Sequence, residues 1–197
     1  MLTVVSGRIL VVDDDPNWGL IVKKLLTRSG NEVATVETGR AALATLEKED
    51  FDIVIIDIIL PDTLGIDLIP RIHAAHPHTV IYVLSGHTDS YSAASAFQQG
   101  AERYIDKSIE PAALQEIVEH TLERQRLTRS LQAERTRYEL LVTNAPIGVF
   151  AIDIATRKFT FLNRFLLDLT GYAPDDAVGH LPTDFVLPED RELLVTR

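Results

Sequence analysis

Five side chains that could bind a metal ion or do covalent chemistry stand at the ends of short apolar runs. They are carboxylates, a hydroxyl and an amine: Asp13, Asp14, Asp57, Ser85 and Lys107. Such runs are typical of strands that are buried on both faces of a parallel sheet. Because the carboxyl ends of these strands meet at one edge, where ligands bind in open α/β folds, we expect the five side chains to converge.

The chemistry that this set supports is phosphoryl transfer assisted by a divalent cation. Three converging carboxylates repel one another unless a cation lies among them, and an all-oxygen ligand set suits Mg²⁺. Asp57 could then attack a phosphoryl group in line and become an aspartyl phosphate. Lys107 would pair with one phosphoryl oxygen, and Ser85 would donate its hydroxyl to another.

Each member of the set also has an ordinary structural explanation. An Asp at a strand end is usually a turn or cap residue, and Asp13–Asp15 could simply stabilise the start of a helix through its dipole. A single lysine is most often a solvated charge. The joint placement of these groups at strand ends favours the phosphoacceptor interpretation.

Five strands that alternate with helices are needed to position these residues. Apolar runs predict strands at Arg8–Val12, Phe51–Asp57 and Thr79–Leu84, and two further strands are predicted at the short segment Glu32–Val36 and the more polar segment Glu102–Asp106. Strands in alternation with helices predict βαβ units, and therefore an α/β fold with a doubly wound, five-stranded parallel sheet covered on both faces.

Helix boundaries are marked by cap residues and by Pro and Gly. Asp15-Pro16 predicts a helix start, Gly30 predicts its end, and Thr38 caps the next helix. A third helix is expected over Leu64–Ala75, in which Pro70 predicts a kink or a late start.

The last helix of this region begins at Pro111 and meets no Gly or Pro before about Val142, so we expect a long helical linker. Its apolar residues form a partial heptad pattern, made by Leu127, Leu131, Tyr138 and Leu141. This pattern is compatible with a dimeric coiled coil, and the alternative is a solvated helix.

The pattern changes to α+β after the linker. Ile147–Asp153 and Lys158–Leu162 predict two antiparallel strands, and Asn163 predicts the cap of a helix over Phe165–Leu169.

Composition excludes several classes of function. The 197 residues carry a net charge of −10, which disfavours a nucleic-acid partner for this segment. The chain has no cysteine, so it has no disulfide, thiolate metal site or cysteine nucleophile. No apolar run approaches the ~20 residues that span a bilayer, and we expect a cytoplasmic location without a membrane partner.

Taken together, these motifs resemble the receiver domain of two-component response regulators, which has the CheY-like fold. The matching positions are the acidic pair, the acceptor with its following loop, and the switch and lysine positions: Asp13, Asp14, Asp57, Leu60–Asp62, Gly65, Ser85, Tyr104 and Lys107. The similarity covers about residues 7–124 and places the receiver domain at 1–124.

The resemblance implies further roles. The carbonyl of Ile59 would complete the Mg²⁺ shell formed with the three carboxylates, and Tyr104 would rotate inward when Ser85 engages the phosphoryl group. The phosphoryl donor would be a histidine kinase or a phosphotransfer protein. A homodimer is expected through the linker helix and the last strand–helix face. The domain would catalyse only its own phosphorylation and dephosphorylation.

One position departs from the family pattern. Ser108 follows Lys107, where the family usually has a proline in a cis peptide bond. Since a cis bond before a residue other than proline costs about 3 kcal/mol, we expect a trans bond and a reshaped loop.

Residues 144–197 resemble the first half of a PAS sensor domain. The similarity is carried by Asn144–Val149, Leu162-Asn163, Thr170–Tyr172 and Leu187–Arg191. That family has five antiparallel strands and only two are predicted here, so we expect unpaired strand edges and an exposed apolar face. The linker would occupy residues 125–143. It would pass the switch to the PAS segment or to a further output module, such as a histidine kinase or a diguanylate cyclase.

Two other functions are compatible with part of the pattern. A phosphatase of the haloacid dehalogenase type also uses a strand-end Asp with Mg²⁺, but it needs a second Asp where this chain has Ile59. The other alternative is a scaffold that dimerises without phosphorylation, and the complete acidic set argues against it.

Overall fold

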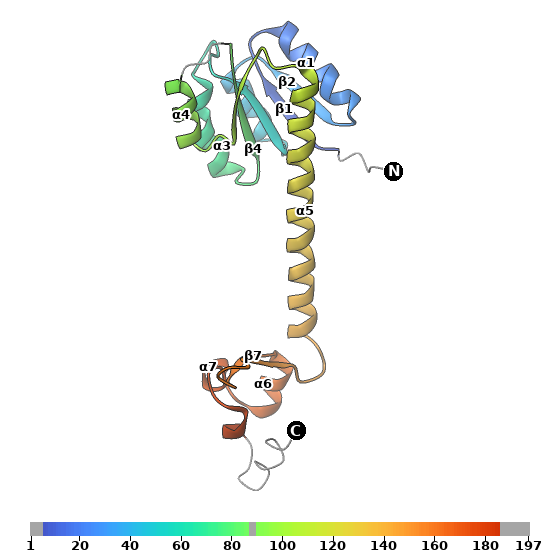
Figure 1. The fold of residues 1–197 in the computed structure, drawn as a ribbon, viewed down its shortest axis with the longest axis vertical. Helices are drawn as coiled ribbons and strands as arrows, with labels where there is room; N and C mark the ends of the chain where they lie inside the picture. Colours follow the sequence, from blue (N-terminus) through green and yellow to red (C-terminus); the bar gives the residue numbers. More distant parts are fainter. Residues whose placement is uncertain (1–5, 87–89, 186–197) are drawn as a thin grey trace. The chain divides into compact units, whose positions relative to one another are not determined.

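The computed structural model describes residues 6–86 and 90–185, and the chain divides into two compact units, Met1–Leu127 and Thr128–Arg197. Figure 1 shows the fold coloured along the sequence. The stretch Leu187–Arg191, which contributes to the PAS resemblance, lies outside the described residues.

The first unit is built around a five-stranded parallel sheet with the order β2-β1-β3-β4-β5. The strands are β1 (Arg8–Val12), β2 (Glu32–Val36), β3 (Ile53–Asp57), β4 (Val80–Ser85) and β5 (Arg103–Asp106). The predicted doubly wound α/β fold is confirmed. Strand order reverses between β1 and β3, and such a reversal opens a crevice at the carboxyl ends of the two strands.

Alternate residues of the strands enter two apolar cores on opposite faces of the sheet. The helices are α1 (Pro16–Arg28), α2 (Gly39–Leu46), α3 (Ile69–Ala75), α4 (Ser90–Gln98) and α5 (Pro111–Thr143). Leu10 and Val54 pack with α2, α3 and α4, whereas Ile9 and Ile55 pack with α1 and α5 (Figure 1). Cover on both faces explains why β3 is apolar up to its final carboxylate.

Most helix boundaries follow the predicted caps. Asp15 accepts a hydrogen bond from the Asn17 N–H at 2.9 Å, and Thr38 accepts one from the Ala41 N–H at 3.1 Å. The helix predicted over Leu64–Ala75 starts late, which is one of the two outcomes that Pro70 predicts. Gly65–Leu68 forms a 3₁₀ turn and α3 begins at Ile69, which places Pro70 in the first turn, where a helix does not need its N–H.

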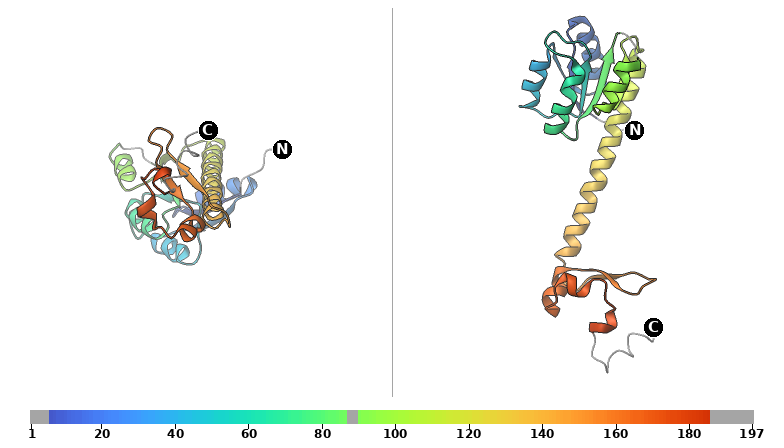
Figure 2. Two further views of the ribbon diagram at one scale, coloured as in Figure 1. Left: turned by 90° about the horizontal axis from the view of Figure 1, so that it is seen from below. Right: turned by 90° about the vertical axis from the view of Figure 1, so that its left-hand side faces the viewer.

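Helix α5 is one uninterrupted element of 33 residues (Figure 2). Its first half is tied to the sheet by side chains: the Tyr82 hydroxyl donates to Thr121 Oγ1, and Gln125 Nε2 donates to the carbonyls of Asp52 and His78. Its heptad residues Leu127 and Leu131 are exposed. In the part of the chain that the structure describes, no helix combines the length and the apolar character needed to cross a membrane.

The second unit contains the antiparallel strands β6 (Phe150–Ile152) and β7 (Phe159–Leu162), followed by α6 (Arg164–Thr170), α7 (Pro174–Ala177) and the 3₁₀ turn Pro182–Phe185. The strand predicted over Ile147–Asp153 is shorter because the buried Asn163 side chain bonds both the Ile147 carbonyl and the Val149 N–H. The expected exposed apolar face is present, with Phe150 at 55% and Ile152 at 43% exposure.

Candidate functional site

Three carboxylates meet at the carboxyl edge of the sheet. Oxygen atoms of Asp13, Asp14 and Asp57 all lie within 4.8 Å of one another. Asp57 is the last residue of β3, and the Asp13 N–H bonds the Val36 carbonyl at 3.0 Å, which continues the β1–β2 ladder by one residue. Asp13 and Asp57 are buried, whereas Asp14 is exposed. The convergence predicted for these three side chains is therefore found.

Lys107 projects into this cluster from the end of β5. Its Nζ donates to Asp57 Oδ2 at 2.6 Å and lies 2.7 Å from Asp13 Oδ2. Its backbone N–H bonds the Ser85 carbonyl at 2.8 Å, which fixes the start of the loop. Burial by itself lowers the pKa of Lys107, but the Asp13 and Asp57 carboxylates outweigh burial and raise it above the ordinary value. The ammonium is therefore charged and held between two carboxylates.

Asp13 is a buried carboxylate of the cluster. Its Oδ1 accepts the Asp15 N–H at 2.9 Å, while its buried Oδ2 contacts Lys107 only as an ion pair and has no hydrogen-bond partner among the described residues. Burial raises the pKa of the Asp13 carboxyl, against the opposing effect of Lys107. A buried carboxylate beside two further carboxylates fits a hard divalent cation.

Ile59 and Ser85 lie at the same edge, and Tyr104 lies within β5. Ile59 donates its N–H to Asp57 Oδ1 at 3.3 Å. Ser85 is buried at the end of β4, next to Leu84, which pairs with Asp57 in the register of the sheet. Tyr104 is half-buried and packs against the core on the α2–α4 face. The switch roles of Ser85 and Tyr104, and the Ile59 carbonyl as a metal ligand, stay predictions.

The loop after Lys107 differs from the family pattern at Ser108, which stands where the family usually has proline. The Lys107–Ser108 peptide bond is trans, as predicted. The Ser108 N–H donates to Asp106 Oδ1 at 2.7 Å, and this tight turn uses a donor that proline lacks.

Asp62 has a structural role that the sequence interpretation missed. Its two carboxylate oxygens accept the N–H groups of Gly39 at 2.8 Å and Arg40 at 2.9 Å, at the start of α2. The backbone bonds from Arg40 and Gly39 lower the pKa of Asp62. The loop that follows the acceptor is thereby tied to a helix start about 22 residues earlier, a distance at which no local sequence pattern gives a signal.

We expect Asp62 to make the free energy of unfolding depend on pH in the acidic range. Because its pKa is lowered in the folded state, its contribution is present above the unfolded value of 3.8 and is lost as pH falls through the folded pKa. Replacing Asp62 with Asn should therefore flatten the decline in unfolding free energy below about pH 4, as measured by urea denaturation at several pH values. Parallel pH curves for the two proteins would contradict the assignment.

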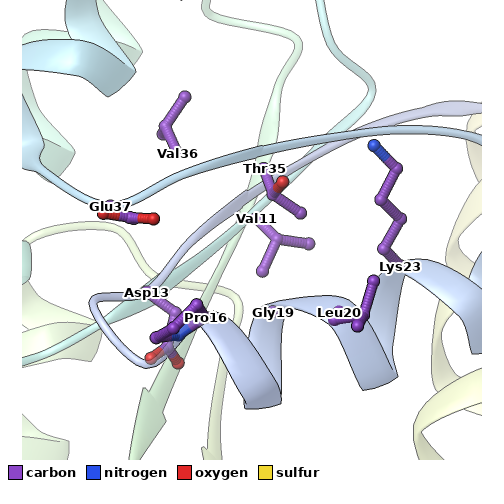
Figure 3. A pocket seen from close by; sticks show the side chains of 9 residues that line it. All are labelled: Val11, Asp13, Pro16, Gly19, Leu20, Lys23, Thr35, Val36 and Glu37. Carbon is purple, nitrogen blue, oxygen red and sulfur yellow. The ribbon is translucent and has the colours of Figure 1, made fainter.

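A cavity of about 290 Å³ adjoins the acidic cluster between α1 and β2 (Figure 3). Its lining includes Asp13, Leu20 and Lys23, and Gly19 contributes no side chain. A Cβ at Gly19 would meet Thr35 Cγ2 at 4.0 Å, which is ordinary contact. The cavity therefore has room for a methyl group at Gly19.

Comparison with known families agrees with this geometry. A family model for the response regulator receiver domain matches residues 9–119, more than half of the chain, and the chain belongs to this family. A second model, for the PAS fold, matches residues 136–197. The chain is thus a receiver domain of a two-component response regulator followed by a PAS fold.

Relatives and solved structures support the same family. The transcriptional regulatory protein GlrR of Escherichia coli K12 is 31% identical over 149 residues, which are 76% of this chain and 33% of GlrR, so the chain spans about a third of that relative. A CheY-like receiver from Methanospirillum hungatei JF-1 superposes with a TM-score of 0.59 at 31% identity, over 61% of this chain and 97% of that one. The beryllofluoride-activated NtrC4 receiver dimer gives a TM-score of 0.57 at 26% identity, over 60% and 98%.

Proposed function

We propose that this chain is a phosphorylation-controlled switch that accepts a phosphoryl group on Asp57. The observation that carries the proposal is the position of Asp57 within a cluster that also holds two carboxylates and the Lys107 ammonium, with 2.6 Å between Asp57 Oδ2 and Lys107 Nζ. The donor would be the phosphohistidine of a histidine kinase or phosphotransfer protein, as the receiver family implies.

Asp13, Asp14 and Asp57 offer carboxylate oxygens of the kind that Mg²⁺ binds. The Ile59 carbonyl would add a further oxygen ligand, as the receiver family implies. When bound, the ion would neutralise negative charge on the incoming phosphoryl group. The burial of Asp13 beside two further carboxylates supports a cation at this position.

The transfer itself needs one nucleophile. A carboxylate oxygen of Asp57 attacks phosphorus in line, a P–O bond forms, and the P–N bond to the donor imidazole breaks. The electron pair of that bond stays on the imidazole nitrogen, which then takes up a proton. Lys107 pairs with a phosphoryl oxygen, and Ser85 donates its hydroxyl to another.

The switch would act on the helix that follows. Ser85 and Tyr104 would shift the equilibrium between two conformations, and α5 would carry the change toward the PAS segment and any output beyond it. In this proposal the receiver promotes only its own phosphorylation and dephosphorylation. The cytoplasmic location stays a prediction.

The test of the function is Mg²⁺-dependent labelling with acetyl phosphate. We expect an acid-stable, base-labile acyl phosphate on the wild type, its absence after Asp57→Asn, and its loss with a chelator. Asp67→Asn, which changes an exposed carboxylate of the same unit, is the matched control and should label normally. A wild type that fails to label with Mg²⁺ present would favour the scaffold alternative.

A homodimer through α5 is a further part of the proposal, and NtrC4 is a relative whose activated receiver is a dimer. Leu131 is 70% exposed on the heptad face of α5. Leu131→Arg should shift the chain toward monomer in light scattering after beryllofluoride treatment, because it places a charge in the seam. Gln132→Arg, one residue away and off the seam, should leave the mass unchanged. Equal masses for both variants would exclude this interface.

A further inference from the structure

Trp18 completes the surroundings of the Lys107 ammonium. Two sides of the ammonium face Asp57 Oδ2 at 2.6 Å and Asp13 Oδ2 at 2.7 Å. A third side faces the indole ring of Trp18, whose centroid lies 5.4 Å from Nζ. Trp18 stands in the first turn of α1, is half-buried, and also packs against the apolar core that α1 and α5 share. The distance is within the range of a cation–π contact.

We propose that Trp18 is a positioning residue for Lys107 that holds the ammonium at the phosphoacceptor through the face of its indole ring. The inference rests on the proposed function of Asp57 and adds a residue that the acidic motif does not contain. A lysine side chain is a compact charge on a flexible four-carbon stem, so its position depends on what surrounds the charge.

The need for a third contact follows from the chemistry. Phosphorylation converts the Asp57 carboxylate into an acyl phosphate, so one of the two carboxylate partners of Lys107 changes its charge and its shape during the reaction. The indole ring of Trp18 keeps its charge and its shape during the same step. Trp18 therefore keeps Lys107 within reach of the phosphoryl oxygens before and after transfer.

A purely structural role for Trp18 makes a different prediction. If the ring only filled space against the core, any apolar side chain of similar bulk would serve. If its π-face holds the ammonium, an aromatic replacement should serve and an aliphatic one should not. Trp18→Phe and Trp18→Leu therefore separate the two roles in the full chain.

The measurement is the rate of acyl phosphate formation with phosphoramidate and Mg²⁺, for the wild type and both variants. We expect Trp18→Leu to slow the reaction about threefold to tenfold and Trp18→Phe to stay within about twofold of the wild type. A second readout does not depend on activity: the Lys107 εCH₂ resonance in ¹³C-lysine-labelled protein should lose its ring-current shift in Trp18→Leu. Thermal melting shows whether each variant is folded.

The outcomes are distinct. Equal rates for wild type and Trp18→Leu, with an unchanged Lys107 resonance, would overturn the inference and leave the phosphoacceptor function intact. Equal slowing by Leu and Phe would show that the rate depends on the size of the side chain at position 18 and not on an aromatic face, and this would also overturn the inference. Failure of the wild type to form any acyl phosphate would remove the function of Asp57, and the positioning role with it.

Discussion

Lys107→Met should slow the formation of the acyl phosphate by about 100-fold, because it removes the fixed positive charge that faces the phosphoryl oxygens. It should also destabilise the protein, since Asp13 and Asp57 are both buried and Lys107 is the cation between them. Two buried carboxylates that lose their counter-charge repel one another. Mg²⁺ should therefore raise the melting temperature of the variant by more than it raises that of the wild type.

Lys48→Met is the control for this experiment, because it removes an exposed lysine from the same unit at a position away from the cluster. It should label at the wild-type rate and respond to Mg²⁺ like the wild type. If Lys107→Met labelled normally, the ammonium would be only a structural counter-ion. If its melting temperature rose no more with Mg²⁺ than that of the wild type, the ion would not take over the charge balance of the two carboxylates.

Gly65→Ala should cost about 2–4 kcal/mol in unfolding free energy, as measured by urea denaturation. A Cβ at this position would lie 1.9 Å from the backbone oxygen of Asp57, and backbone atoms cannot yield as a flexible side chain can. The Gly65 N–H also bonds the Ile58 carbonyl at 2.7 Å, so the loop cannot move away without losing this bond. We expect the labelling of Asp57 to fall as well, because the acceptor itself would be displaced.

Gly19→Ala provides the matched comparison. Gly19 lies inside α1, and a Cβ there meets only Thr35 Cγ2 at 4.0 Å, within the cavity of Figure 3. Alanine in a helix interior is favoured over glycine by about 0.5–1 kcal/mol, so this variant should be more stable than the wild type. A loss of stability in both alanine variants would show that the close approach of Gly65 to Asp57 is not the cause.

The sheet was predictable because its strands have a simple requirement. Strands covered on both faces must be apolar throughout, and the runs that end at Val12 and Asp57 meet that requirement directly. The carboxylates and Lys107 could then be placed by topology, since each stands at a strand end. The Thr38 cap was predictable for a different reason, because its hydrogen bond joins residues only three positions apart in the sequence.

What could not be predicted depends on contacts between distant segments. Asp62 bonds the start of α2, and the Trp18 ring faces Lys107, but neither residue lies in a pattern that identifies its partner. The shortened β6 has the same origin, because Asn163 bonds backbone groups that a strand would otherwise use. In each case the two interacting groups are close in space but distant in the sequence.

The attachment of α5 to the sheet has a geometric consequence for the whole helix. Tyr82 and Gln125 fix the rotation of α5 about its axis at Thr121 and Gln125, and the helix continues to Thr143 without a break. Along a continuous helix each residue turns the chain by about 100°, so seven residues return a side chain to within about 20° of its starting direction. Insertions or deletions of seven residues in α5 would therefore preserve its heptad pattern, whereas other lengths would interrupt it.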